Sequence, residues 1–450
     1  MPDRRPRMLV IGAGPVGLCM AKSLRQRGIA YDQVDADDDV GGNWKHGVYD
    51  SAHIISSKKT TQYSDFPMPA DYPDFPSRLQ ILDYLRSYTE HFQLRSTIEF
   101  RTKVLRCQPI RAEGVEEIWQ VDLDNGERRI YKGVVVCNGH HWERRWPTIA
   151  GEFTGDYLHS KDYKRAEQLE GKRVLVIGGG NSACDVASEA ARVGQSCHLS
   201  LRRGFWILPK TFCGIPIVEV LPGWLPIWAQ RLCLRTIVRL VFGRHEKYGL
   251  PHPDHRLFEA HPTINGELLN YIQQGRILPK CDVARFEGKT VHFTDGSQQE
   301  FDAVVCATGF YVRFPFLPPD LVPVRNDQQA QLYGGICVPD YKHLYVVGTS
   351  QPRYGFGPLI TLGGELIARI IQLQDEMVLP FGRLLKELGY TPASTHLQCP
   401  HAALREIRLG LRTIPYLRFR ERLLRRKFGK SAPPPTVPEC PTVDPQLSVY

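Results

Sequence analysis

Three glycines and an aspartate near the N-terminus have the residue types and the spacing that bind a dinucleotide. Gly12, Gly14 and Gly17 form a G-x-G-x-x-G pattern, and Asp35 follows 18 residues after the last glycine. The first glycine permits a tight turn, the second lets a pyrophosphate approach the backbone, and the third allows a helix to pack closely on a strand. An acid at this distance accepts hydrogen bonds from a ribose hydroxyl. The pattern predicts a dinucleotide-binding site.

The segments around these residues are those that such a site requires. Residues 8–11 are apolar and predict a buried strand, and a helix is expected from the glycines through about residue 27. Free N–H groups at the start of that helix would hold the phosphates. A second strand over residues 31–34 ends at Asp35, and the loop after it contains Gly42 and Trp44, which suit a loop folded over a planar ring.

The same pattern returns in the middle of the chain. After an apolar strand, the glycine positions and the start of the next helix are taken by Gly178, Gly180, Asn181, Ser182 and Ala183. The third glycine position tolerates alanine, so the pattern is intact. It predicts a second dinucleotide site.

Landmarks further along keep nearly the same register in both halves of the chain, which indicates two homologous domains. The pairs are Gly12 and Gly178, Gly126 and Gly296, and Gly139 and Gly309, at offsets of 166, 170 and 170 residues. In the second half the last strand ends at Thr308 and Gly309, whose small side chains let a nucleotide lie close. The expected fold class is α/β, with two Rossmann-like domains.

The residues after the second strand of each domain differ in charge. Asp35 would repel a 2′-phosphate, whereas Arg202 and Arg203 follow the corresponding strand of the second domain. A guanidinium can clamp a 2′-phosphate with two parallel hydrogen bonds. FAD is therefore expected in the first domain and NADPH in the second. The alternative is that Arg203 is a solvated charge at a strand end.

The composition is that of an ordinary globular protein. The chain has 450 residues, of which 42% are hydrophobic and 23% charged. It contains no apolar run long enough to cross a membrane, and its N-terminus leads directly into the first strand, so a cytoplasmic protein is expected. The twelve cysteines include no C-x-x-C pair, which argues against zinc ribbons, other metal sites and dithiol chemistry.

The net charge of +9 comes almost entirely from one segment. Residues 404–430 hold ten Lys and Arg against Glu406 and Glu421, so the charge does not indicate nucleic-acid binding. A basic segment with interleaved apolar residues is typical of a membrane surface or of an amphipathic helical pair that packs on the core with solvated arginines. The second interpretation is favoured. Residues 431–450, rich in proline, are expected to be a disordered tail.

The linker between the two domains carries a family signature. It reads F-x-G-x-x-x-H-x-x-x-Y-K, with Phe153, Gly155, His159, Tyr163 and Lys164 at the defined positions. Here the chain resembles the flavin-containing monooxygenases. The related Baeyer–Villiger monooxygenases carry Trp at the position of Tyr163. The resemblance makes His159 a candidate catalytic residue, and the alternative is that His159 has a structural role.

The resemblance extends over about residues 8–371 and implies further cofactor-binding positions. The matching segments are G-G-N-W with Gly42 and Trp44, S-D-F-P with Asp65, G-H-H from Gly139, A-T-G-F with Thr308 and Gly309, and Q-P from Gln351. It implies that residues 1–165 are the first part of the FAD domain and 166–315 the NADPH domain, with a variable insertion at about 205–279. Residues 316–430 would return to the FAD domain and end in basic helices.

The chemistry that the resemblance implies is oxygen transfer. In such enzymes NADPH reduces FAD, dioxygen forms a C4a-hydroperoxyflavin, and one oxygen atom passes to a small organic substrate by N- or S-oxygenation or by Baeyer–Villiger oxidation. The apolar and basic stretch 224–244 varies in the family and is interpreted as a membrane contact, a lid or core. The sequence leaves open whether residues 224–244 or 404–430 touch a membrane peripherally, and whether the protein is a homodimer.

One position departs from the family pattern. An asparagine that family members place near the flavin and the nicotinamide falls on Ile55, which has no amide to donate. Ser56, Ser57 or Lys58 would replace it, or the enzyme would release peroxide as an NADPH oxidase. The alternatives to a monooxygenase are therefore an NADPH oxidase or reductase-type flavoprotein and a non-catalytic flavin-binding protein.

Overall fold

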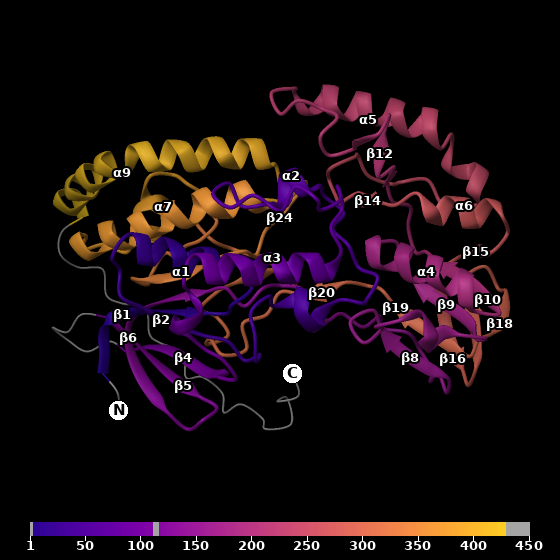
Figure 1. The fold of residues 1–450 in the computed structure, drawn as a ribbon, viewed down its shortest axis with the longest axis horizontal. Helices are drawn as coiled ribbons and strands as arrows, with labels where there is room; N and C mark the ends of the chain where they lie inside the picture. Colours follow the sequence, from indigo (N-terminus) through magenta and orange to yellow (C-terminus); the bar gives the residue numbers. More distant parts are fainter. Residues whose placement is uncertain (1–2, 111–116, 429–450) are drawn as a thin grey trace.

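The computed structural model describes residues 3–110 and 117–428, which form two α/β domains side by side (Figure 1). Each domain is built on a mostly parallel sheet whose central strands are buried on both faces. Such strands must be apolar along their whole length. Met8, Leu9 and Val10 in the first sheet and Val174, Leu175 and Val176 in the second are fully buried. The two apolar runs of the sequence are thus the centres of the two sheets.

The first sheet has the order β3-β2-β1-β6-β5-β4, and β23 pairs with the end of β6. Its strands are β1 (Asp3–Ile11), β2 (Tyr31–Val34), β3 (Ile98–Glu99), β4 (Val104–Ile110), β5 (Ile118–Leu123), β6 (Arg128–Val136) and β23 (Leu344–Val346). Because β23 follows the whole second domain in sequence, the first domain is made from both ends of the chain. This confirms the expected fold class.

The second sheet has the order β15-β10-β9-β19-β8. Its strands are β8 (Asp156–His159), β9 (Arg173–Ile177), β10 (Ser196–Ser200), β15 (Ile277–Lys280) and β19 (Ala303–Cys306). A three-stranded meander lies beside it, made of β16 (Val283–Glu287), β17 (Thr290–Phe293) and β18 (Gln298–Glu300). The parallel strands repeat the order of the first sheet. However, β8 precedes residue 165, so the second domain begins earlier than the expected boundary.

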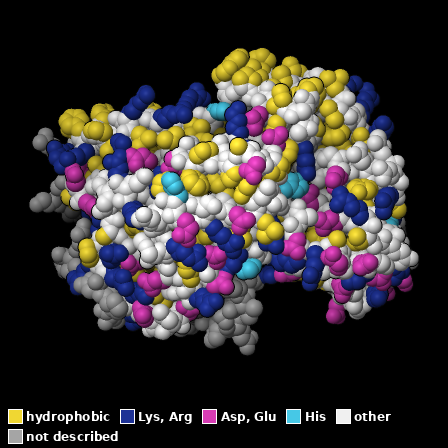
Figure 2. Space-filling model, in the orientation of Figure 1, with side chains coloured by type: hydrophobic (Ala, Val, Ile, Leu, Met, Phe, Trp, Pro, Cys, Tyr) yellow, Lys and Arg dark blue, Asp and Glu magenta, His cyan; other side chains and the backbone are white. Residues whose placement is uncertain are grey.

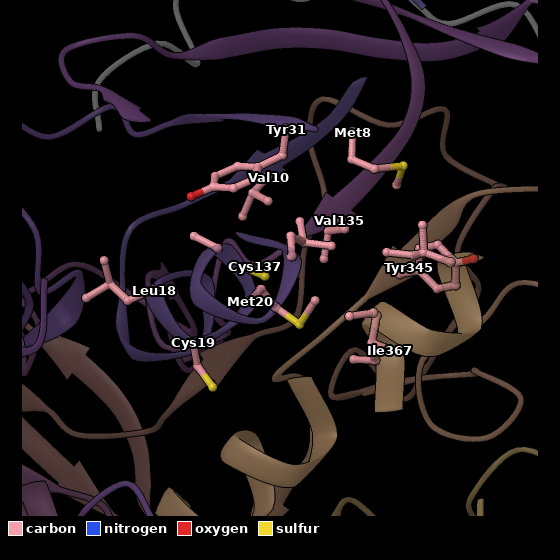
Figure 3. Packing of buried hydrophobic residues seen from close by; sticks show 14 of the residues in the cluster. Met8, Val10, Leu18, Cys19, Met20, Tyr31, Val135, Cys137, Tyr345 and Ile367 are labelled. Carbon is pink, nitrogen blue, oxygen red and sulfur yellow. The ribbon is translucent and has the colours of Figure 1, made fainter. Parts of the chain in front are cut away.

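Helices cover both sheets. Those of the first domain are α1 (Pro15–Gln26), α2 (Lys58–Thr61), α3 (Arg78–His91), α7 (Gly357–Glu376), α8 (Phe381–Glu387) and α9 (Pro400–Phe428), and those of the second are α4 (Asn181–Val193), α5 (Ile227–Val241) and α6 (Glu267–Gln273). The returning helix α7 packs against α1 so closely that a Cβ on Gly364 would lie 2.6 Å from Ser23 Oγ. Figure 3 shows Tyr345 and Ile367 in the same core as Met8 and Val135.

The C-terminal segment differs from the expectation in one respect. The basic residues lie on a single long helix, α9, which continues through Pro415, and not on a helical pair. Its neighbours α7 and α9 pack along each other. The expected disordered tail lies outside the described residues. Among the helices that are described, none has both the length and the apolar character needed to cross a bilayer.

Candidate active site

A large cavity lies at the carboxyl ends of the first sheet's strands. Its volume is about 2770 Å³, and we refer to it as the main cavity. The carboxyl ends of parallel strands are where open α/β sheets bind ligands. The expected site residues in its lining are Gly12, Gly14, Asp35, Gly42, Trp44, Ser56 and Gln351. The structure thus brings together residues from three distant parts of the chain.

The glycines of the first pattern are shaped for a dinucleotide. Gly12 has a φ of +106°, and a Cβ there would lie 2.5 Å from the carbonyl oxygen of Cys137. A Cβ on Gly17 would strike the carbonyl oxygen of Gly12 at 1.9 Å, so the helix can approach the strand only with glycine there. By contrast, a Cβ on Gly14 would meet only Gly42, at 3.8 Å. The protein itself leaves room at Gly14, which is the position that faces the pyrophosphate in this fold.

The carboxylate of Asp35 closes the glycine loop and borders the cavity. It accepts hydrogen bonds from the backbone N–H groups of Ala13 and Asp37. Burial raises the pKa of Asp35, while these bonds act to lower it. A carboxylate has more acceptor sites than these two donors fill, so it can also accept from a ribose. The loop, the helix start and the acid therefore fit FAD.

The second glycine loop repeats this geometry. Gly178 has a φ of +131°, and a Cβ there would lie 2.4 Å from the carbonyl oxygen of Ala307. Nothing lies within 4 Å of a Cβ on Gly180. Asn181 accepts a hydrogen bond from the backbone N–H of Ile264 at 2.8 Å, and Ala183 is fully buried under the loop. The arrangement fits a second dinucleotide, outside the lining of the main cavity.

The other residues expected around the second nucleotide lie near the same loop or at the hinge. Arg202 and Arg203 are exposed just beyond β10, and Arg203 interacts electrostatically with the carboxylate of Asp254. Ser182, at the start of α4, interacts with Tyr49. The hydroxyl of Thr308 donates to the carbonyl oxygen of Arg145, and Gly309 has a φ of +88°. Their roles toward NADPH remain predictions.

His159 does not line the main cavity. The side chain is fully buried at the end of β8. Its Nδ1 accepts from the backbone N–H of Lys161 at 3.1 Å, so Nε2 carries the proton and donates to the carbonyl oxygen of Gly309 at 3.1 Å. Burial lowers the pKa of His159 to about 4. Both ring nitrogens are bonded to backbone, so the neutral ring holds the end of β8 against the segment that follows β19.

The other residues of the linker signature make local contacts and contacts to both domains. A Cβ on Gly155 would lie 2.7 Å from the ring of Phe153. Tyr163 donates a hydrogen bond to Glu189 of α4, and Lys164 donates to the carbonyl oxygen of His46 at 2.7 Å. Through Lys164 the signature is thus tied to the first domain, and through Tyr163 to α4 of the second.

A polar network that the sequence did not reveal crosses the same boundary. Tyr49 donates to Asp185 at 2.6 Å and Ser51 donates to Glu189, both on α4. Asn265 of the insertion donates to Asp185 at 2.9 Å. Nothing in the sequence pattern marks these partners, because they are far apart along the chain.

Three expected site residues have other partners. Asp65 forms an ion pair with Lys22 and does not line the main cavity. Ser57 caps α2 through a capping box with Thr60. Lys58 donates to the carbonyl oxygens of residues 69, 70 and 72, the last at 2.6 Å. Ser57 and Lys58 are therefore not placed to replace the family asparagine.

Ile55 and Ser56 do line the main cavity. Ile55 packs on an apolar cluster of the insertion, which includes Trp206 and Leu208. The Ser56 hydroxyl lies 2.7 Å from that of Thr61. Of the three proposed replacements for the amide, only Ser56 borders the cavity.

Several polar residues of the cavity wall were not predicted. His140, His141 and His261 line it, and His396 lies beside His140. Burial lowers the pKa of His140 to about 4. Lys161 donates to Asn43 at 2.8 Å, and burial lowers its pKa to about 8. The G-H-H and linker segments contain three of these residues, so their motifs were the available signal.

Two dinucleotide loops in one chain, held together by a hinge beside a large cavity, define a flavoprotein that uses two cofactors. A model of the flavin-binding monooxygenase-like family matches residues 5–378. The chain is 32% identical to flavin-containing monooxygenase 5 of Homo sapiens over 427 residues, which cover 87% of this chain and 80% of that protein. It is 30% identical over 393 residues to dimethylaniline monooxygenase [N-oxide-forming] 2 of Rattus norvegicus, at 81% and 73% coverage.

The fold is also that of a solved structure. The ε-caprolactone-bound cyclohexanone monooxygenase superposes with a TM-score of 0.74 over 94% of this chain and 99% of that one, at 17% identity. The chain belongs to the flavin-binding monooxygenase-like family. It is an FAD- and NADPH-dependent monooxygenase that acts on a small molecule and dioxygen.

Proposed function

We propose that the chain transfers one oxygen atom from dioxygen to a nitrogen or sulfur atom of a small organic molecule in the main cavity. The observation that carries this is the pair of matching glycine loops, Gly12 against Cys137 and Gly178 against Ala307, on two domains fixed by one hinge. The relatives include a dimethylaniline monooxygenase named for N-oxide formation, which supports a soft nucleophile as substrate. Tyr163, where Baeyer–Villiger enzymes carry Trp, favours the same reaction.

FAD and NADPH, when bound, supply the electrons and the activated oxygen. The residues of the chain have three tasks. Gly12, Gly14 and Asp35 would hold FAD, and the loop at Gly178 with Arg203 would hold NADPH. The bonds of Lys164 to His46 and of Tyr49 to Asp185 link the two domains and so fix the separation of the two sites. The apolar wall that includes Ile55 excludes water from the reacting atoms.

The proposal includes a peripheral membrane contact of a cytoplasmic enzyme. Apolar side chains are exposed along α5 and the turn before it: Trp224 is 81%, Trp228 68% and Leu240 73% exposed. In Figure 2 hydrophobic side chains gather over α5 and also over α9, on one edge of the molecule, with Lys and Arg among them. Aromatic and basic side chains together suit an anionic lipid surface. Sedimentation with anionic vesicles tests this contact; a homodimer stays a prediction from the sequence.

The reaction is tested with the purified holoenzyme, NADPH and a panel of thioethers, tertiary amines and ketones. The proposal expects S-oxides or N-oxides, with more NADPH than NADH turnover at equal concentration. Exclusive conversion of ketones to esters or lactones would contradict the assignment to nitrogen and sulfur. NADPH oxidation that yields only hydrogen peroxide with every substrate would contradict oxygen transfer.

A further inference from the structure

A second, smaller hollow lies between the starts of α5 and α9. Its volume is about 640 Å³, and we refer to it as the vestibule. It is lined by Gly223, Trp224, Leu225, Pro226, Ile227, Gln230, Arg353, Cys399, His401, Leu404, Arg405 and Arg408. Arg353 also lines the main cavity, so one side chain borders both spaces.

The charges of the vestibule have one sign. Arg353, Arg405 and Arg408 line it, and none of its lining residues is acidic. Within residues 3–110 and 117–428, no carboxylate forms an ion pair with any of these three arginines. Three guanidinium groups around one small space repel each other unless an anion or solvent compensates them. The lining is therefore complementary to an anion.

The guanidinium of Arg353 is fixed by stacking, but one of its N–H donors has no acceptor in the described part of the chain. Its guanidinium stacks over the ring of Phe258, 4.7 Å from the ring centre, and its backbone N–H donates to Gln398 at 3.0 Å. Its buried Nε has no hydrogen-bond partner in the described part of the chain. A planar guanidinium fixed by stacking loses little freedom when it pairs with a carboxylate. The side chain is thus preorganised for an oxygen ligand.

Two helix N-termini add partial positive charge around the vestibule. His401, Arg405 and Arg408 recur on one face of α9 at its N-terminal end. The N-terminus of α5 begins after Pro226 and has no side-chain cap. Gly223 fits against the ring of His401, since a Cβ there would lie 2.2 Å from that ring. Both helices therefore direct the positive ends of their dipoles toward the vestibule.

The remaining wall is apolar. Trp224 and Leu225 of the turn before α5, Ile227 at the start of α5 and Leu404 of α9 line it. Such a wall excludes a small hydrated inorganic ion as the best ligand and fits an organic body attached to the anion. The position of Arg353 between the two cavities fits a molecule whose anionic end stays at Arg353 while its other end reaches the main cavity.

We propose that the vestibule recognises the carboxylate of an organic acid substrate, with Arg353 as the anchor and Arg405 and Arg408 as the rim that attracts it. This inference rests on the proposed function and names its substrate class: organic acids that carry a thioether or amine nucleophile. The volume of the vestibule and the presence of Arg353 in the linings of both cavities favour a small molecule over a lipid surface.

The test compares para-(methylthio)benzoate with its methyl ester, which has the same thioether and no charge. The holoenzyme is expected to show a higher kcat/KM for the acid than for the ester. Arg353→Gln should lower the ratio of kcat/KM for the acid to that for the ester by about tenfold or more, because a hydrogen bond to a charged group is lost only with the acid. Arg412→Gln, an exposed change on α9 outside both linings, is the matched control and should change neither.

Calorimetric titration of the oxidised holoenzyme with each compound gives a readout that does not depend on turnover. If the acid binds and Arg353→Gln weakens that binding, the role of the vestibule is supported. If in addition no compound is oxygenated, that result counts against the proposed function alone. If acid and ester bind equally and Arg353→Gln changes neither affinity, the proposed role of the vestibule is overturned. Turnover of the ester would still leave the proposed function intact. Binding of anionic vesicles that requires Arg405 and Arg408, without any preference for the acid, overturns it in favour of a lipid headgroup.

Discussion

Gly12 lies so close to Cys137 that a Cβ on the glycine would stand 2.5 Å from the cysteine's carbonyl oxygen. The same relationship joins Gly178 and Ala307 at 2.4 Å in the second domain. In both cases a glycine with positive φ packs against the end of the strand that lies beside it in the sheet. The contact brings the glycine loop and the small residues after that strand to one ligand. The two sites are therefore built in the same way, and the residues around each loop determine which ligand it binds.

Gly14→Ala should separate cofactor binding from folding. The added methyl group meets only Gly42, at an ordinary contact distance of 3.8 Å, so we expect the free energy of unfolding of the flavin-free protein to change by less than about 1 kcal/mol. The methyl group would stand where the pyrophosphate approaches, so the purified variant should carry no FAD. Flavin absorbance of the purified protein and thermal unfolding of the flavin-free forms measure the two effects.

Gly12→Ala is the contrasting variant, because a Cβ at this position would collide with the carbonyl oxygen of Cys137. It should unfold at a lower temperature than Gly14→Ala in the flavin-free state. Retention of FAD by Gly14→Ala would contradict the assignment of this loop to the pyrophosphate.

Arg203→Ala should weaken NADPH binding and spare NADH. A charge-assisted pair with the 2′-phosphate contributes about 1.5–3 kcal/mol, so KM for NADPH should rise by about tenfold or more. NADH lacks that phosphate, and its KM should stay the same. Steady-state flavin reduction with each coenzyme measures the preference. An unchanged NADPH to NADH ratio would rule out Arg203 as the clamp, and Arg202→Ala would then be the variant to compare.

Ile55→Asn should improve the coupling of NADPH oxidation to product. The isoleucine borders the main cavity and offers no hydrogen bond, and one bond worth about 1.4 kcal/mol changes a rate about tenfold. The share of NADPH that ends as hydrogen peroxide should fall accordingly. Ile55→Val keeps the apolar character and is the matched control. If the peroxide share of Ile55→Asn equals that of the control, position 55 does not govern coupling.

His159 should make the protein less stable in mild acid. Its pKa is lowered from 6.5 to about 4 by burial, so between these values the unfolded chain binds a proton that the folded protein does not. The stability is therefore complete above pH 6.5 and decreases as the pH falls toward 4, by about 3 kcal/mol for this residue. Denaturant unfolding of the native protein and of His159→Gln across this pH range gives the difference. A gap between the two proteins that is independent of pH would contradict the neutral, backbone-bonded ring.

The features that the sequence predicted well depend on local spacing. Gly12, Gly14 and Asp35 lie where the pattern placed them, because a strand, a tight turn and a helix leave few geometries for that spacing. The internal repeat also predicted the second sheet. A resemblance to one family added the hinge signature, and the structure shows that Lys164 of that signature binds His46 of the first domain while Tyr163 binds α4 of the second.

The features that the sequence did not predict depend on contacts between distant segments. The sequence left open whether His159 is catalytic or structural, because its burial and its backbone partners are not visible in the sequence. Ser57 caps helix α2, and Lys58 donates a hydrogen bond to the backbone carbonyl oxygen of Tyr72. Arg353 has no motif at all: its role follows from the approach of α5, α9 and the returning chain.

The central claim is oxygen transfer, and isotopically labelled dioxygen tests it most directly. The holoenzyme is given NADPH, a thioether and labelled dioxygen, and the S-oxide, the NADPH consumed and the hydrogen peroxide formed are measured together. The account predicts an S-oxide that carries the label, with NADPH consumption equal to the sum of S-oxide and peroxide. Full NADPH consumption as peroxide, with no labelled product, would contradict it.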